Sequence, residues 1–353
     1  MSEDTGTEVL FSRDRRVGHI LLNRPRVMNA LTLRMVDEIA AKLDEWAIDD
    51  TVETVVVSGA GDRGLCAGGD IVALYRQVLA GGEDAALFWA HEYALNAQIA
   101  RYPKPYVALM DGTVFGGGVG VSAHGSVRVV TERTKIGMPE VGIGFVPDVG
   151  GTWLLSRAPG ELGTHVGLTG GTFSAADAIE LRLADFFVPS NRLGDLVEAL
   201  ASMPVSDALA GFATDVPASA LAGARSWIDD CYGLEDAFEI VASLDASDVA
   251  EARYAADVIR SKSPTAVAVT LESLRRARAL HTLEQVLDQE YRVSVRLAAG
   301  TEMVEGIRAQ VIDKDRQPRW SPATLAGVAR SAVEAYFAPV GRDELGLLSP
   351  TAR

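Results

Sequence analysis

Residues capable of chemistry gather in one stretch of the chain, from Val107 to Gly151. A triple glycine, Gly116–Gly118, follows an apolar run typical of a buried strand and precedes a second apolar run, Val119–Ala123. Backbone N–H groups at such a strand-to-helix turn stabilise a developing oxyanion, and the helix dipole adds positive potential. Glu140 and Asp148 follow, and carboxylates move protons or attack carbonyls. We therefore predict acyl chemistry that needs neither a metal nor a redox cofactor.

A second glycine turn, Cys66-Ala-Gly-Gly-Asp70, lies between the β-branched run Thr54–Val57 and a predicted helix that begins near Ile71. Two glycine turns, each after a buried strand, can supply two N–H donors to one oxygen. Each turn also has a simpler interpretation. Asp70 is typical of a helix N-cap, and the triple glycine is typical of a tight helix–sheet contact.

The carboxylates also have structural interpretations. Glu140, after Pro139, is either a turn or cap acceptor or a working acid or base. Asp148 is typical of an N-cap before a helix over Thr152–Ser156. Glu92 lies on a predicted helix, where a solvated face is the default. An apolar setting such as MPEVGIGFVPD raises the pKa of a carboxyl group, which favours the catalytic interpretation.

Other motifs are weaker. Gly118-x-Gly120-x-x-Ala123 matches a dinucleotide fingerprint only loosely, because the surrounding βαβ pattern is poor. The stretch from Gly120 to His124 lacks the second glycine of a serine-hydrolase nucleophile elbow. The 5 histidines are scattered without ligand spacing, so we predict no metal site.

Composition narrows the class of protein further. The 353 residues are 48% hydrophobic and carry a formal net charge of −15, which disfavours nucleic acid and anionic lipid as partners. An anionic ligand therefore needs a local basic patch. The 2 cysteines fit a reducing compartment. The polar N-terminus has no signal-peptide core, and no apolar run reaches membrane-spanning length. We predict a soluble cytoplasmic protein.

Alternating strands and helices predict an α/β fold for the first part of the chain. The predicted strands are Glu8–Phe11, Val17–Asn23, Tyr106–Met110 and Val127–Thr131. One predicted helix starts at Thr32, and two more are Ile71–Val78 and Ala85–Ala100. We assign residues 1–201 to this α/β core and residues 202–353 to a helical C-terminal region.

The C-terminal region contains strong helix signals. Ser263-Pro264 is an N-cap followed by proline at the first helical position. Leu283–Ala299 is amphipathic, and Thr301–Ile312 is a third predicted helix. The stretch Ser202–Ala224 is rich in small residues and is our candidate linker between the two parts.

Several of these segments resemble a known family. ILLNRPRVMNALT, SGAGDRGLCAGGDI and DGTVFGGGVG resemble the crotonase, or enoyl-CoA hydratase/isomerase, superfamily. MPEVGIGFVPDVGG, SPTAVAVTLESL and IDKDRQPRWSP resemble its 3-hydroxyisobutyryl-CoA hydrolase branch, and the resemblance covers roughly Val9 to Val328. It implies a crotonase-like spiral of ββα units followed by helices. It also implies an acyl-CoA thioester as substrate, with coenzyme A as part of that substrate rather than a cofactor.

The resemblance assigns roles residue by residue. Gly69 and Gly117 match the two N–H donors of the family's oxyanion hole. Glu140 and Asp148 match the two acids that carry the chemistry in the hydrolase branch, and Glu92 matches a helical glutamate that contacts the acyl group.

The coenzyme A site is expected near the N-terminus. Arg26, Val27 and Met28 match the stretch that lines this site in the superfamily. Arg26 is also the simplest basic group by which an acidic protein binds an anionic nucleotide.

The resemblance also separates subclasses. Hydratases place a glutamate two residues after the triple glycine, where this chain has Gly120, and they place glycine where Asp148 stands. Dienoyl-CoA isomerases require a third carboxylate at the Gly120 position. We therefore expect hydrolysis of 3-hydroxyisobutyryl-CoA, or of a similar short β-hydroxyacyl-CoA, in valine catabolism.

Two alternatives stay open: a hydratase or isomerase of the same superfamily, and a catalytically silent acyl-CoA-binding protein. Superfamily members commonly assemble as trimers or hexamers through C-terminal helices. A homo-oligomer is therefore an expectation too, although this branch differs in its C-terminal region.

Overall fold

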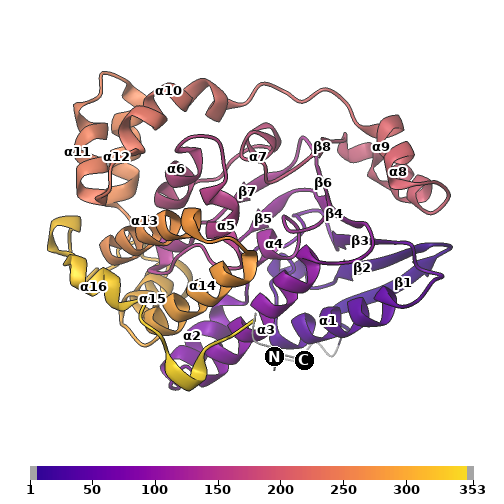
Figure 1. Ribbon diagram of the computed structural model, residues 1–353, viewed down its shortest axis with the longest axis horizontal. Coiled ribbons are helices and arrows are strands. Elements are labelled where there is room, and N and C mark those ends of the chain that lie inside the picture. Colours follow the sequence, from indigo (N-terminus) through magenta and orange to yellow (C-terminus); the bar gives the residue numbers. More distant parts are fainter. Residues whose placement is uncertain (1–5, 348–353) are drawn as a thin grey trace.

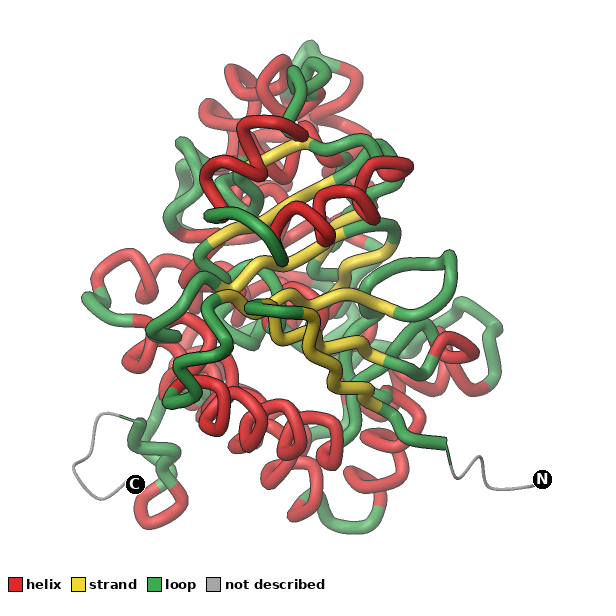
Figure 2. The backbone as a smooth tube through the Cα atoms, turned by 90° about the vertical axis from the view of Figure 1, so that its right-hand side faces the viewer, coloured by secondary structure: helices red, strands yellow, loops and turns green. Residues whose placement is uncertain are grey.

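The computed structural model describes residues 6–347, in which one mixed sheet is surrounded by helices (Figures 1 and 2). Six strands of this described range form the sheet, in the order β1 (Val9–Asp14), β2 (Val17–Leu22), β3 (Thr54–Gly59), β4 (Tyr106–Met110), β6 (Val127–Val130), β8 (Phe186–Phe187). β1 is antiparallel to β2, and every later pair is parallel. A small second sheet pairs β5 (Thr113–Phe115) with β7 (Lys135–Gly137) in parallel.

Helices connect these strands and form the rest of the chain. Those of the first part are α1 (Leu33–Ala47), α2 (Ile71–Leu79), α3 (Glu83–Ala100), α4 (Gly117–Gly120), α5 (Gly151–Ser156), α6 (Leu162–Thr169), α7 (Ala175–Glu180), α8 (Leu193–Leu200). Those of the second part are α9 (Val205–Phe212), α10 (Ala220–Tyr232), α11 (Ala237–Ala246), α12 (Ala250–Arg260), α13 (Pro264–Ala279), α14 (Leu283–Ala298), α15 (Glu302–Ile307), α16 (Arg330–Ala335).

Local sequence signals explain where the main helices begin. The Thr32 hydroxyl accepts a hydrogen bond from the Met35 amide at 3.2 Å and starts α1. Ser263 caps α13 in the same way, with Pro264 at the first helical position. Thr282 and Gln285 form a reciprocal capping box at the start of α14. These predicted helix starts are confirmed.

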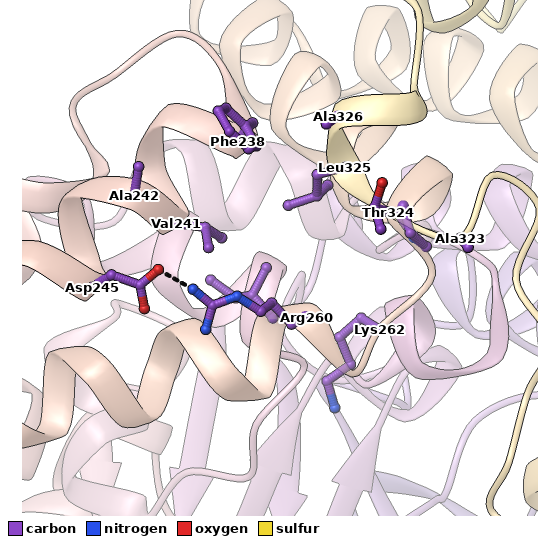
Figure 3. A pocket seen from close by; sticks show the side chains of 12 residues that line it. Phe238, Val241, Ala242, Asp245, Arg260, Lys262, Ala323, Thr324, Leu325 and Ala326 are labelled. Carbon is purple, nitrogen blue, oxygen red and sulfur yellow. Dashed lines mark hydrogen bonds and ion pairs between the residues drawn. The ribbon is translucent and has the colours of Figure 1, made fainter.

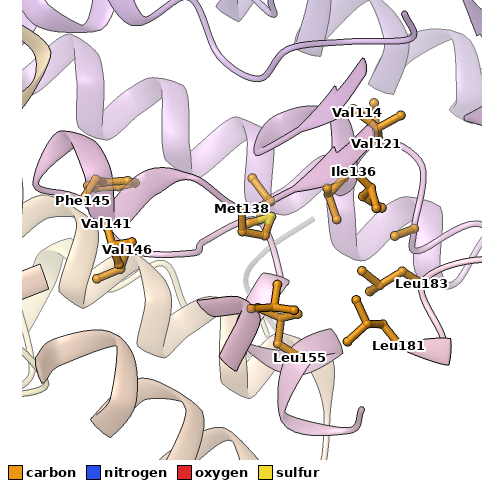
Figure 4. Packing of buried hydrophobic residues seen from close by; sticks show 14 of the residues in the cluster. Val114, Val121, Ile136, Met138, Val141, Phe145, Val146, Leu155, Leu181 and Leu183 are labelled. Atoms are coloured by element: carbon orange, nitrogen blue, oxygen red, sulfur yellow. The ribbon is translucent and has the colours of Figure 1, made fainter. Parts of the chain in front are cut away.

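The sheet separates two hydrophobic clusters. Val55 and Val57 of β3 face the larger cluster, whereas Val56 faces the smaller one, as the two-residue period of a strand requires. The larger cluster continues into α13 and α14, so the C-terminal helices cover the same core (Figure 1). Met138 and Phe145, from the segment that carries Glu140 and Asp148, pack in the larger cluster (Figure 4).

The predicted linker region, residues 202–224, is largely helical, and its role as a linker stays a prediction. The stretch 202–224 contains α9 and the start of α10, and an extended connection remains only at residues 213–219 (Figure 1). Its many alanines are good helix formers, and Ala208 and Leu209 bury α9 against the smaller cluster. The division of the chain at residue 201 stays a prediction. The third predicted C-terminal helix is α15 followed by a π-helical turn, η4 (Arg308–Ile312).

Candidate active site

Strand register brings the two glycine turns together. The segment after β3 runs alongside β5, with Cys66 paired in parallel to Val114. The Cys66 amide donates to the Thr113 carbonyl at 3.1 Å, and the Phe115 amide donates to the Cys66 carbonyl at 3.0 Å. Because the turns leave this ladder at matching positions, Gly69 and Gly117 line one cavity.

Both glycine amides face that cavity without a protein acceptor. Within the described range, neither Gly69 nor Gly117 donates its N–H to another residue. A Cβ built on Gly117 would lie 3.4 Å from the Gly69 nitrogen, so one small group can touch both amides. α4 is a single helical turn, so its dipole contributes little positive potential. Stabilisation of a negative charge in the cavity therefore depends on the two amides themselves.

The triple glycine makes room for two carboxyl groups. A Cβ on Gly116 would lie 2.7 Å from Glu140 Oε1, and one on Gly117 would lie 2.5 Å from Glu92 Oε1. Gly116 also has φ 49°, which favours glycine. A Cβ on Gly118 would collide with the Cys66 carbonyl, so this third glycine is a packing requirement. Gly118 therefore fits the packing interpretation of the motif, whereas the role of Gly117 as an oxyanion donor stays a prediction.

The cavity has a volume of about 170 Å³ and combines apolar walls with three acids. Its acids are Glu92, Glu140 and Asp148, all buried. Its apolar wall consists of Ile71, Leu74, Phe88, Trp89, Phe115, Pro139, Ile143, Phe145, Met303 and Val311. Such a lining suits a short apolar acyl group with a few polar atoms.

Glu92 is not on a solvated face, so that default interpretation is wrong. Its side chain is 2% exposed on α3 and points at the triple glycine. Among the described residues, Glu92 Oε1 and Glu140 Oε2 are buried without a hydrogen-bond partner. Buried polar atoms are normally paired, so these two oxygens are positioned for a ligand.

Asp148 is not a helix N-cap, so the structural alternative is wrong. α5 begins at Gly151 with Gly150 as its N-cap, and neither needs the Asp148 side chain. Instead Asp148 Oδ2 accepts a hydrogen bond from the Tyr93 hydroxyl at 2.7 Å. The carboxylate is thereby directed into the cavity rather than along the helix.

Burial dominates the electrostatics of the three acids. Burial raises the pKa of Asp148 to about 7, against the opposing effect of the Tyr93 hydrogen bond. Burial and then the nearby Asp148 carboxylate raise the pKa of Glu140 well above its ordinary value. The pKa of Glu92 is raised well above its ordinary value by burial, Asp148 and Glu140. The titrations of the three groups are therefore coupled, and each carboxyl group holds its proton more tightly than it would in water.

Cys66 does not compete as a nucleophile. Burial raises the pKa of its thiol to about 12, so the thiolate is scarce at neutral pH. Asp70 has the simpler role considered for it, because it caps α2 by accepting from the Ala73 amide at 3.1 Å. It also pairs with Arg24 at 2.9 Å.

The predicted coenzyme A segment lies beside the acyl cavity rather than inside it. Arg26 and Val27, in the short helix η1 (Pro25–Val27), line a separate groove of about 590 Å³. Met28 is hydrogen-bonded to the first glycine turn, because its carbonyl oxygen accepts from the Ala67 amide at 3.0 Å. The structure thus joins this segment to the first glycine turn without bringing its side chains to the acids.

The position that carries the second acid of a hydratase is sterically filled. A Cβ on Gly120 would lie 2.8 Å from both Asn96 Nδ2 and Val149 Cβ. Asn96 is fully buried, so it has no free space into which to move. A longer side chain at residue 120 does not fit this arrangement.

A larger cavity elsewhere lacks this chemistry. It has a volume of about 310 Å³ and lies between α11, the end of α12 and residues 323–326 (Figure 3). Its walls are mainly apolar, with Phe238 and Leu325 on opposite sides. Its carboxylate, Asp245, is paired with Arg260. We therefore place the candidate active site at the glycine turns.

Sequence reasoning missed the residues that support Asp148. Tyr93 follows Glu92 directly, while Glu290 and Ser294 lie on α14. A signal was present, since Leu287, Glu290 and Ser294 share one helical face. Two polar residues on an apolar stripe indicate buried hydrogen bonding.

Comparison with known proteins defines the class. The family model for enoyl-CoA hydratase/isomerase matches residues 17–337, and the chain belongs to this family. The predicted superfamily and α/β fold class are confirmed.

Relatives within the family resemble the chain over nearly its whole length. A Danio rerio protein named 3-hydroxyisobutyryl-CoA hydrolase, mitochondrial, is 38% identical and covers 98% of this chain and 94% of its own. The Homo sapiens protein of that name is 35% identical, covering 97% of this chain and 91% of its own. These relatives support the predicted hydrolase branch.

Two solved structures share the fold closely. A Mycobacterium thermoresistibile protein described as a carnitinyl-CoA dehydratase is 54% identical with a TM-score of 0.94, covering 96% of this chain and 98% of its own. A Rhodobacter sphaeroides protein described as an enoyl-CoA hydratase is 42% identical with a TM-score of 0.90, covering 96% and 99%.

Two findings concern the location of the protein in the cell. Among residues 6–347, no helix combines the length and apolar character needed to cross a membrane. The named hydrolase relatives are mitochondrial, so the predicted cytoplasmic location is not confirmed.

Proposed function

We propose that the protein hydrolyses the thioester of 3-hydroxyisobutyryl-CoA, or of a similar short β-hydroxyacyl-CoA, to the free acid and CoA. One observation carries the proposal. Two unengaged amides and the Glu140–Asp148 pair face one small cavity, while the second hydratase position, Gly120, is closed by Asn96. The names of the hydrolase relatives support the same reaction.

The cleavage begins at the thioester carbonyl. Its oxygen receives hydrogen bonds from the Gly69 and Gly117 amides, which stabilise the tetrahedral intermediate. Glu140 either attacks the carbonyl carbon to form an anhydride or removes a proton from an attacking water. Collapse of the intermediate then breaks the carbon–sulfur bond, and the CoA thiolate leaves and takes up a proton. On the anhydride route, a water molecule then hydrolyses the anhydride, which releases the free acid and restores the Glu140 carboxylate.

The remaining acids control orientation and protons. Asp148 orients the substrate hydroxyl or the water and assists proton transfer. Glu92 contacts the acyl group through the carboxyl oxygen that has no protein partner among the described residues. Because burial raises the pKa of Glu92 well above its ordinary value, Glu92 can hold a proton for the departing sulfur, whereas Glu140 must be ionised to attack the carbonyl or to accept a proton from water.

A second candidate function is hydration or dehydration of an acyl-CoA. It is favoured by the descriptions of the two similar solved structures as a dehydratase and a hydratase. The closed Gly120 position argues against it, because addition of water to a double bond then lacks its second acid. A catalytically silent acyl-CoA-binding protein is the remaining alternative.

A free-thiol assay on a panel of short acyl-CoA esters separates these functions. Hydrolysis releases thiol from 3-hydroxyisobutyryl-CoA, and Glu140→Gln abolishes that release. Loss of crotonyl-CoA absorbance without thiol would favour a hydratase. Tight binding of the esters with no turnover would favour the silent protein. Near-normal thiol release by Glu140→Gln would show that the assigned roles are wrong.

Further parts of the proposal concern partners and place. The reaction draws on backbone amides and carboxyl groups, with no cofactor beyond the substrate's own coenzyme A. Arg26, Val27 and Met28 border the coenzyme A moiety. We also propose a cytoplasmic homo-oligomer that acts in valine catabolism.

A further inference from the structure

The turn that carries Asp148 has an unfavourable backbone. Val149 has φ 54° and Gly150 has φ 76°. The left-handed region suits glycine but is strained for a β-branched residue such as valine. Surrounding contacts must therefore hold this turn in place.

Side chains from two distant segments, the partly buried His124 and the buried Glu290, hold the turn in place. His124 Nε2 lies 2.8 Å from the Val149 carbonyl oxygen. Burial lowers the pKa of His124 to about 4, so the ring is neutral and Nε2 is the donor to that carbonyl. Glu290 Oε2 accepts from the Gly150 amide at 2.7 Å, and Oε1 accepts from the Thr152 amide at 2.9 Å and hydroxyl at 2.6 Å.

The carboxylate of Asp148 has its own anchor. Tyr93 donates its hydroxyl hydrogen to Asp148 Oδ2 at 2.7 Å. The same hydroxyl oxygen lies 2.8 Å from Ser294 Oγ, which can donate to it in return. Tyr93 and Ser294 are fully buried, and Ser294 lies one helical turn after Glu290 on α14. One face of a C-terminal helix thus supports both the turn and the acid.

We propose that Tyr93 and Glu290 are positioning residues for Asp148, so that α14 belongs to the catalytic machinery. None of the described residues that line the acyl cavity comes from α14. Tyr93 fixes the direction of the carboxylate, and Glu290 fixes the backbone that presents it. This inference rests on the proposed thioester hydrolysis.

Among the described residues, the side chains that interact with the Asp148 carboxyl group are Tyr93, by a hydrogen bond, and Glu92, Glu140 and Glu290, by charge. Each of these three acids opposes the ionisation of Asp148 when it is itself ionised, whereas the Tyr93 hydrogen bond favours it. Loss of the Tyr93 hydroxyl therefore raises the pKa of Asp148. If Asp148 works as a carboxylate, the rise of kcat with pH moves to higher pH.

Tyr93→Phe tests the inference. Because a hydrogen bond to a charged group is lost, kcat falls about 10- to 100-fold with little change in KM. The matched control is Tyr102→Phe, which removes a hydroxyl that donates to the Leu43 carbonyl at 2.9 Å, away from the site. This control keeps the kcat and pH profile of the unaltered protein.

A double-mutant cycle shows whether Tyr93 acts through Asp148. In an Asp148→Asn background, Tyr93→Phe has little further effect, whereas independent roles would give multiplying losses. Glu290→Gln lowers kcat as well. Both carboxylate oxygens of Glu290 accept hydrogen bonds from backbone N–H groups, and the NH2 group of the glutamine would replace one of these acceptors with a donor. Isothermal titration calorimetry with a non-hydrolysable CoA thioether checks that each variant is folded and still binds the ligand.

The outcomes are distinguishable. If the wild type hydrolyses the ester and the Tyr93→Phe variant keeps the same kcat and pH profile, this inference alone is overturned. Losses that multiply in the Asp148→Asn background would overturn it as well. If the wild type released thiol from no ester, the proposed function would fall and this inference with it.

Discussion

Gly117→Ala places one methyl group in the oxyanion site. The backbone of Gly117 lies outside the left-handed region, so alanine is compatible with its conformation. The new Cβ would meet Glu92 Oε1 at 2.5 Å and Leu31 Cδ1 at 3.1 Å. Both atoms are ends of flexible side chains. Leu31 gives way by a few tenths of an ångström, and the Glu92 carboxyl group moves further, into the cavity that it lines. We therefore expect the variant to fold.

The effect on catalysis is large because the methyl group crowds the position of the substrate oxygen. It would lie 3.4 Å from the Gly69 nitrogen, close to where a carbonyl oxygen must sit to accept from both amides. Loss of one oxyanion donor costs on the order of 3 kcal/mol of transition-state stabilisation. At about 1.4 kcal/mol per tenfold, kcat falls roughly 100- to 1000-fold.

The assay is thiol release from 3-hydroxyisobutyryl-CoA at saturating substrate, with melting temperature measured in parallel. Gly223→Ala in α10 is the matched control, because a Cβ there meets nothing within 4 Å. It keeps full activity and gains up to about 1 kcal/mol of stability from helix propensity. If folded Gly117→Ala retained kcat within about threefold of the wild type, the assigned oxyanion hole would be refuted.

Three further variants test other parts of the account. Because burial raises the pKa of Glu92, its ionisation with rising pH costs the folded state stability, so Glu92→Gln gains more melting temperature over the wild type near pH 9 than near pH 5. Equal shifts at both pH values would contradict this. Gly120→Glu overpacks against Asn96, costs about 1–3 kcal/mol of stability and gains no crotonyl-CoA hydration; acquired hydration would count against the closed position. Met303→Ala enlarges the acyl cavity, so kcat/KM shifts toward longer acyl chains across an ester series; an unchanged preference would remove Met303 from the acyl wall.

Much of the fold could be predicted because it depends on local signals. The Thr32, Ser263 and Thr282 caps start helices where the sequence predicts them. The β-branched run at Thr54–Val57 forms β3. The family resemblance adds the order of the elements, which periodicity alone does not provide.

The site was harder to predict because it depends on long-range register. The pairing of Cys66 with Val114 brings the two glycine turns together, and no local pattern encodes that pairing. Glu92 and Asp148 were ambiguous for the same reason. Their neighbours in sequence suit an exposed face and a helix cap, whereas burial by distant elements directs both into one cavity.

A crystal structure of Glu140→Gln with bound 3-hydroxyisobutyryl-CoA shows whether both glycine amides bind the thioester oxygen. We predict that this oxygen lies about 2.7–3.1 Å from both the Gly69 and Gly117 nitrogens. We also predict that Asp148 reaches the acyl hydroxyl or a water beside the carbonyl carbon. A carbonyl bound in another cavity, or turned away from either amide, would contradict the proposed oxyanion hole.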